Sequence, residues 1–75
     1  MSDMNHLDAT GLLCPLPVLK ARKRLAGLSA GAELTVKADD PAAIVDIPHF
    51  CVEAGHELVT RDVDGPVQTY VIRKG

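Results

Sequence analysis

The chain has 75 residues, of which 47% are hydrophobic and only Phe50 and Tyr70 are aromatic, and its net charge is −2. This length accommodates one domain, residues 1–75, whose core is too thin for a separate cofactor-binding lobe. The negative charge and the scarcity of aromatic stacking residues argue against a nucleic-acid binder. We therefore expect one small domain without a cofactor or a direct nucleic-acid partner.

Two segments with alternating apolar and polar residues predict strands, over His6–Thr10 and Glu33–Asp39. Gly11 ends the first. Because a helix is predicted between them, the two strands should be parallel and joined by a right-handed crossover. Their alternation implies that one face of the sheet is solvated, so helices should cover only the other face.

The first predicted helix begins at Pro15 and exposes Lys20, Lys23 and Arg24. Its apolar arc comprises Val18, Leu19, Ala21, Leu25, Ala26 and Leu28. Arg22 falls inside this arc, so it should either extend along its stem to solvent or meet a carboxylate. We favour an ion pair, with Asp46 as the candidate partner.

A second helix is predicted after the second strand, and Pro48 should interrupt it. Its predicted parts are an N-cap at Asp40, a first helical residue at Pro41, a short turn through Val45, a kink at Asp46–Ile47, a second helical piece over Pro48–Ala54 and a C-cap at Gly55. Each part follows from a local rule about proline, glycine or a capping side chain.

The remaining chain predicts a hairpin. Strands over Glu57–Asp64 and Val67–Arg73 flank Asp64-Gly65-Pro66, so they should be antiparallel. The complete order is β-α-β-α-β-β. This order predicts an α+β fold of two layers, with two helices on one face of a four-stranded mixed sheet.

Charge is unevenly distributed along the chain. From Ala9 to Ala32 there is no acidic residue and the charge is +4, so the rest of the chain carries −6. Such a basic segment is either a solvated helix face or a docking surface for an acidic protein partner.

The sequence indicates a cytoplasmic protein without a membrane partner. Met1–Asn5 is polar and is not followed by the apolar stretch of a signal peptide. No apolar run approaches the roughly 20 residues that span a bilayer. The two cysteines, Cys14 and Cys51, do not form a Cys-x-x-Cys pair, and a reducing compartment is the simplest interpretation.

Cys14 is the candidate reactive residue. It lies where the first strand gives way to the first helix, in the motif Cys14-Pro15-Leu16-Pro17. The helix dipole and nearby basic residues favour a thiolate and predict a lowered pKa. Pro15 and Pro17 remove two backbone donors, so this lowering should be modest. We expect the prolines to present an exposed, rigidly held sulfur rather than to activate it.

Cys51 should be a core residue, because it lies within a predicted helix beside Phe50 and Val52. A metal site formed by both cysteines with His49 and His56 is nominally possible. However, the spacings match no structural zinc pattern, and we expect no metal.

Three blocks of the sequence resemble the TusA/SirA-like sulfur-carrier family. They are Leu7–Val18 (LDATGLLCPLPV) followed by Arg22-Lys23, Ala38–Ala42 (ADDPA) continuing to Cys51 and His56-x-Leu58, and the tail Asp64–Gly75. The tail is similar to the branch of the family that supplies tRNA thiolation. The resemblance implies the β-α-β-α-β-β fold and a carrier of persulfide sulfur that accepts it from a cysteine desulfurase and passes it to downstream acceptor proteins. Such a carrier is a relay component rather than a stand-alone catalyst.

The family's active cysteine corresponds to Cys14. The family pattern also marks Arg22, Asp39, Asp40 and Asp46, which implies roles in architecture or docking. Pro15 and Pro17 complete the supporting motif.

Family members often carry Arg before the cysteine and Glu between the prolines, where this chain has Leu13 and Leu16. The surface around the sulfur should therefore be apolar. We expect Leu13, Leu16, Lys20, Lys23 and Arg24 to form the partner-docking surface.

Alternative functions stay open on sequence alone. Relatives also serve molybdenum-cofactor assembly or sulfur oxidation, so the acceptor pathway is undecided. A thiol redox protein that uses Cys14 and Cys51 belongs to a different class. An RNA-binding module is a third, because small two-layer folds recur in that role.

Overall fold

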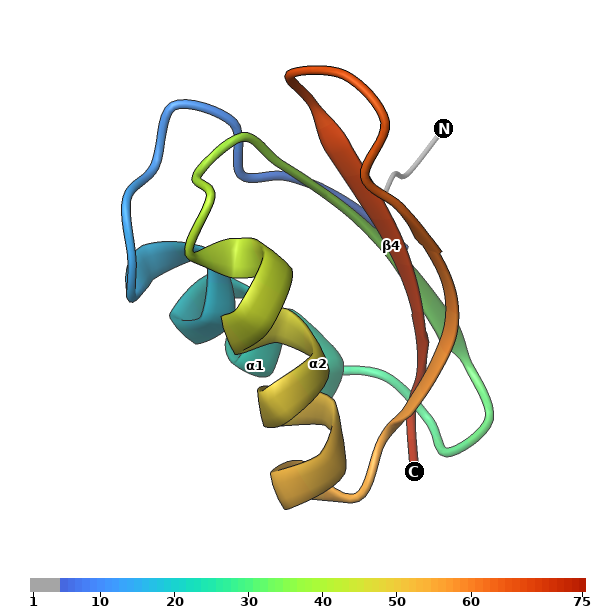
Figure 1. Ribbon diagram of the computed structural model, residues 1–75. Coiled ribbons are helices and arrows are strands. Elements are labelled where there is room, and N and C mark those ends of the chain that lie inside the picture. The colour runs from blue at the N-terminus through green and yellow to red at the C-terminus, as the bar shows by residue number, and fades with distance from the viewer. Residues whose placement is uncertain (1–4) are drawn as a thin grey trace.

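The computed structural model describes residues 5–75, so the polar start of the chain, on which the signal-peptide prediction partly rests, lies outside it. The elements are β1 (His6–Asp8), α1 (Leu16–Ala26), β2 (Glu33–Ala38), α2 (Ala43–Ala54), β3 (Glu57–Asp62) and β4 (Gln68–Arg73). The strand order is β1-β2-β4-β3, with β1 parallel to β2 and both β4 pairings antiparallel. Both helices lie on the same side of the curved sheet (Figure 1). The predicted fold and topology are confirmed.

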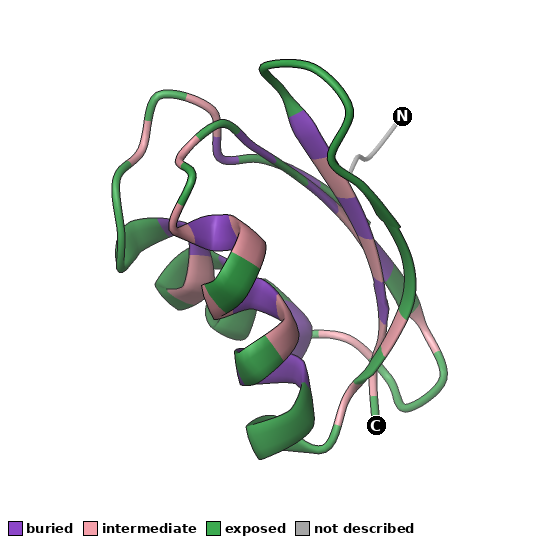
Figure 2. Cartoon of the chain, viewed as in Figure 1, coloured by how far each residue is buried: buried purple, intermediate pink, exposed green. Residues whose placement is uncertain are grey.

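The core lies between the sheet and the helices. In β4, Gln68, Tyr70 and Ile72 are buried while the alternate residues are partly exposed, and β2 alternates in the same way. In Figure 2 the buried segments of the strands and helices face the space between the two layers. Aliphatic side chains supply nearly all of this core, because Phe50 and Tyr70 are the only aromatic residues.

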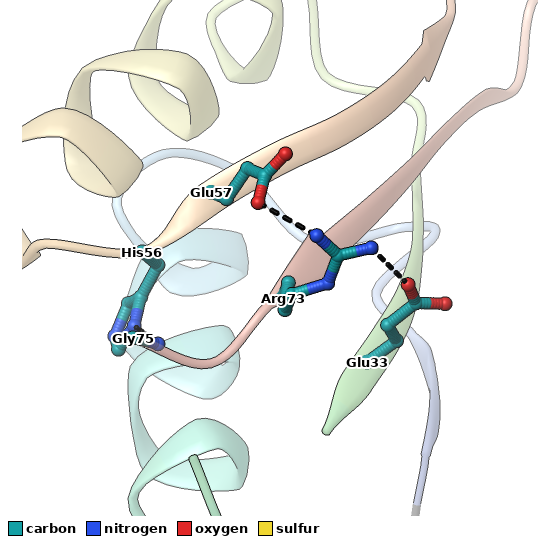
Figure 3. A network of polar contacts seen from close by, with 5 residues as sticks. All are labelled: Glu33, His56, Glu57, Arg73 and Gly75. Carbon is teal, nitrogen blue, oxygen red and sulfur yellow. Dashed lines mark hydrogen bonds and ion pairs between the residues drawn. The ribbon is translucent and has the colours of Figure 1, made fainter. Parts of the chain in front are cut away.

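The open face of the sheet carries a polar network that joins three strands (Figure 3). Arg73 donates to Glu57 at 2.8 Å and to Glu33 at 3.1 Å. Both glutamates lie opposite Arg73 in the strand register. The helices therefore cover one face only, as the alternating pattern predicts.

Aspartates end three of the strands earlier than predicted. The carboxylate of Asp8 accepts the Thr10 N–H at 3.0 Å, that of Asp39 accepts the Gly11 N–H, and that of Asp62 accepts the Asp64 N–H at 3.1 Å. A side chain that takes a backbone donor in this way replaces a ladder hydrogen bond and favours a turn. β1, β2 and β3 consequently stop at Asp8, Ala38 and Asp62.

α1 packs on a narrower stripe than the predicted arc. Pro17, Ala21 and Leu25 are buried at four-residue intervals, whereas Leu19 is 48% exposed. Ala26 is also exposed. The prediction that Leu19 and Ala26 face the core was wrong. A helix of 11 residues in a domain of this size buries only the stripe that packs against the sheet and α2.

α2 is a single helix from Ala43 to Ala54 that contains Pro48, so the predicted interruption was wrong. Proline removes one hydrogen bond and crowds the preceding turn. Ile47, Phe50 and Cys51 on either side of it are buried against the sheet, and this packing keeps the helix continuous. The N-terminal boundary is also shifted, because the residue before the helix is Ala42 rather than Asp40. Gly55 ends the helix with φ of 79°, as predicted.

Neither helix in residues 5–75 has the length and apolar character needed to cross a lipid bilayer.

Candidate functional site

Cys14 lies on the loop between β1 and α1, and its side chain is exposed. α1 begins two residues later, with Pro15 as its N-cap and Pro17 inside its first turn. The Leu16 N–H donates to the Leu13 carbonyl at 2.8 Å, which closes a tight turn around the cysteine. The sulfur therefore stands at the solvent-exposed start of a proline-stiffened helix, as predicted.

Two successive aspartates after β2 hold this loop. Asp39 accepts the Gly11 N–H at 3.0 and 3.1 Å through both carboxylate oxygens, and Asp40 accepts the Cys14 N–H at 2.5 Å. The carboxyl ends of β1 and β2 meet at one edge because the strands are parallel. Figure 1 shows the segment before α1 (blue) beside the segment before α2 (yellow-green). Gly11 has φ of 80°, a left-handed conformation that glycine adopts at no steric cost.

The thiol of Cys14 donates a hydrogen bond to Asp46. The Sγ–Oδ2 distance is 2.8 Å, and Asp46 lies in the first turn of α2. Two of the residues marked by sequence, 32 positions apart, are thus in direct contact.

Arg22 does not form the predicted ion pair with Asp46. Its guanidinium carbon lies 5.4 Å from the centre of the Phe50 ring. This geometry is a cation–π contact, which lets a charged group on the edge of the apolar arc remain exposed. The interpretation of Arg22 as partner of a carboxylate was wrong, because its stem reaches across to α2 at Phe50 rather than at Asp46.

The Cys14 thiol has a raised pKa, contrary to the predicted modest lowering. The hydrogen bond to Asp46 is the largest cause, followed by desolvation and by the negative charges of Asp46 and Asp40. Ionisation would place a thiolate against a carboxylate and lose the donated proton. Sequence reasoning weighed the helix dipole and missed the two acidic residues that folding brings to the sulfur.

An open groove of about 300 Å³ runs between the two helices beside this contact. It is lined by Pro15, Val18, Arg22, Asp46, His49, Phe50 and Glu53. His49 Nε2 lies 2.9 Å from Glu53 Oε1, one helical turn further along α2. Sequence analysis did not assign His49, Phe50 or Glu53 to the site. They follow Asp46 by three, four and seven positions, and this spacing places them on one face of α2.

The predicted docking residues are all exposed, with Leu13 and Leu16 flanking the cysteine and the three basic residues further along α1. Leu13 is 70% and Leu16 is 44% exposed, so both offer apolar surface beside the cysteine. Lys20, Lys23 and Arg24 are also exposed. Arg24 additionally donates to the carbonyl of His6 at 2.9 Å, so part of its hydrogen-bonding capacity is used on β1. Leu19 extends the apolar area, which we call the leucine patch (Leu13, Leu16 and Leu19).

Comparison with known proteins identifies the family to which this fold and loop belong. The sequence matches the family described as sulfurtransferase TusA over residues 5–74. The chain belongs to the TusA family. Its structure is also similar to a SirA-like protein from Desulfitobacterium hafniense, with a TM-score of 0.81 and 30% identity over 93% of this chain and 96% of that one. Membership of this family supports a role as a sulfur carrier that exchanges sulfur with donors and acceptors.

Cys51 of this TusA-family chain is 1% exposed and belongs to the core, as predicted. Burial raises the pKa of its thiol. A buried, protonated thiol is a poor partner for exchange, so Cys51 packs rather than reacts.

Within residues 5–75 no three His, Cys, Asp or Glu side chains converge in the manner of a metal site.

Proposed function

We propose that the protein carries sulfane sulfur as a persulfide on Cys14, taking it from a cysteine desulfurase and relaying it to acceptor proteins for tRNA 2-thiouridine modification. One observation carries this proposal: an exposed thiol, held at the start of a proline-stiffened helix, donates a hydrogen bond to a carboxylate 2.8 Å away. The TusA family match supports sulfur as the cargo. The tail Asp64–Gly75, which is similar to the tRNA-thiolation branch of the family, motivates the choice of pathway.

The transfer step needs no oxidant. The Cys14 sulfur attacks the outer sulfur of the donor persulfide while its proton passes to Asp46. The donor S–S bond breaks as a new one forms on Cys14, and the departing donor thiolate takes up the proton. One thiol and one persulfide are consumed and one of each is formed. In the resting protein the negative charge of Asp46 stabilises the proton on the Cys14 thiol. During transfer the same carboxylate accepts that proton.

The surroundings of Cys14 suit a protein partner. A donor active site must bring its persulfide to the sulfur, and the leucine patch offers apolar contact next to it. Lys20 and Lys23 follow on the same helix and favour an acidic partner surface. The groove with Asp46, His49 and Glu53 adjoins the site through Asp46, the residue that contacts the sulfur, and through Pro15, which follows Cys14.

Sulfur loading tests the proposal directly. Incubation with a cysteine desulfurase and cysteine should raise the intact mass by one sulfur atom, and Cys14→Ser should abolish the gain. Cys51→Ala should load like the wild type, since the buried thiol takes no part. If the wild type gains no sulfur, the proposal is wrong. If loading requires Cys51, the redox alternative replaces it.

Docking has matched controls on the same chain. Leu13→Asp should slow loading strongly, whereas Val52→Asp, at a site 81% exposed near the far end of α2, should not. Lys23→Glu should slow loading most at low salt, and Lys37→Glu on the open sheet face should not. If the two variants of either pair slowed loading equally, docking through this surface would be contradicted.

A further inference from the structure

A chain of hydrogen bonds connects the hydrophobic core to the Cys14 loop. The Tyr70 hydroxyl donates to Gln68 Oε1 at 2.7 Å, and Gln68 Nε2 donates to the backbone carbonyl of Asp40 at 3.0 Å. The carboxylate of the same Asp40 accepts the Cys14 N–H at 2.5 Å. Four residues from three parts of the chain therefore form one continuous path.

Gln68 and Tyr70, the two residues of this path that lie in the core, are in an unusual environment for polar groups. Gln68 is 4% exposed and Tyr70 is 0% exposed, and both point from β4 into the core, whose other side chains are apolar. Burying an amide is costly unless its donors and acceptors are paired. Ile72, the next inward residue of the same strand, shows that an aliphatic side chain fits this layer. Packing alone gives no reason for an amide at position 68.

The path has a definite direction. The Asp40 backbone carbonyl can only accept a hydrogen bond, so the Gln68 amide must turn its NH₂ group toward it and leave Oε1 to accept from the Tyr70 hydroxyl. Tyr70 supplies a hydroxyl donor, and burial raises its pKa, so it stays protonated. With Oε1 occupied by Tyr70, the Gln68 NH₂ group faces the Asp40 carbonyl. Gln68 also pairs with Ala38 in the strand register, which places it next to the end of β2 from which Asp40 continues.

We propose that Gln68 and Tyr70 are positioning residues that hold Cys14 in place through Asp40. They touch neither the sulfur nor a partner. They fix the backbone of Asp40, the Asp40 carboxylate fixes the Cys14 amide, and the thiol is thereby kept at the Asp46 oxygen. The importance of this path for sulfur transfer rests on the proposed function, whereas its effect on thiol reactivity does not.

Two substitutions break the path with little change in shape. Gln68→Met keeps the length of the side chain and removes its polar atoms, and Tyr70→Phe removes only the hydroxyl. Each should lower the rate of sulfur transfer from loaded protein by up to about a hundredfold, the cost of a misplacement of about 1 Å in a reacting group. Each should also move the pH profile of Cys14 alkylation by iodoacetamide to lower pH, because a looser loop weakens the contacts with acidic groups that raise the thiol pKa.

Ile72→Val is the matched control, since it removes one methylene from the same face of the same strand and leaves the path intact. It should lower thermal stability without changing the alkylation profile. A merely structural role for Gln68 would make all three variants behave alike.

A double-variant cycle tests the route through Asp40. In an Asp40→Ala background, Tyr70→Phe should have no further effect on the pH profile, because the link to Cys14 is already cut. Additive effects would overturn the inference, and so would wild-type profiles in both single variants. If Gln68→Met does not fold, Tyr70→Phe decides the question. A shifted profile in a protein that cannot be loaded with sulfur would support the positioning role and refute the proposed function.

Discussion

Asp40→Ala tests how firmly the loop that carries the sulfur is held. The carboxylate accepts the Cys14 N–H at 2.5 Å and the Ala42 N–H at 3.2 Å. The second is a turn contact just before α2 rather than a helix cap, and its loss costs about 0.5–1.5 kcal/mol, as for an ordinary hydrogen bond. Loss of an ordinary intramolecular hydrogen bond such as the first adds about 0.5–1.5 kcal/mol, because water replaces the partner at this exposed backbone position. The expected loss in the free energy of unfolding for the two hydrogen bonds together is therefore about 1–3 kcal/mol.

Thermal unfolding followed by circular dichroism measures this loss. For a domain of 60–100 residues each kcal/mol shifts the Tm by about 4–8 °C, so a drop of about 4–24 °C is expected. Asp62→Ala is the control, since it breaks a single exposed turn contact, with the Asp64 N–H, and should stay within about 0.5 kcal/mol of the wild type. A Tm for Asp40→Ala equal to that of Asp62→Ala would refute the view that this carboxylate anchors the loop.

Three further outcomes follow from the structure. In Asp46→Asn the carboxylate charge that raises the Cys14 pKa is gone, so the pH profile of thiol alkylation should move to lower pH and the rate at neutral pH should rise; an unchanged profile would contradict the contact. Leu25→Ala should cost about 2–5 kcal/mol in urea unfolding, while Leu19→Ala should cost less than about 0.5 kcal/mol, because only the first is buried. Arg73→Ala should cost about 0–1 kcal/mol for each of its two exposed ion pairs, and the cost should shrink in high salt.

The fold was accessible from sequence because its signals are local. Alternating strands and the glycine-bounded hairpin specify the order of elements, and the topology follows from general rules of connection. The same local rules failed where tertiary packing competes with them. Pro48 should break a helix in isolation, yet the buried residues on both sides of it hold α2 together. Asp40 was expected to cap α2 and instead accepts the amide of Cys14 as well as that of Ala42.

For a related reason, the sequence predicted the exposure of the Cys14 thiol but not the direction of its pKa shift. The exposure of Cys14 follows from its own neighbours, namely a glycine-led turn and two prolines. The sign of its pKa shift depends on Asp40 and Asp46, which lie 26 and 32 positions away. A single sequence carries no measure of which acidic residues will reach the sulfur. The expected pair between Arg22 and Asp46 failed in the same way, since helix periodicity places Arg22 near α2 without selecting the residue it meets.

The raised pKa of Cys14 suits a carrier better than a lowered one would. A protonated resting thiol is protected from oxidation, since the thiolate is the form that reacts. Nucleophilicity rises with pKa, so the fraction that does ionise in a donor complex is more reactive. Once loaded, the outer sulfur stands one S–S bond, about 2.05 Å, further out than the atom that Asp46 now contacts. The carboxylate then acts less strongly on the charge of that sulfur. Under the proposed function, the contact between Cys14 and Asp46 therefore keeps the thiol of the unloaded carrier protonated and unreactive. In the loaded carrier the same contact leaves the outer sulfur free to ionise and to be transferred.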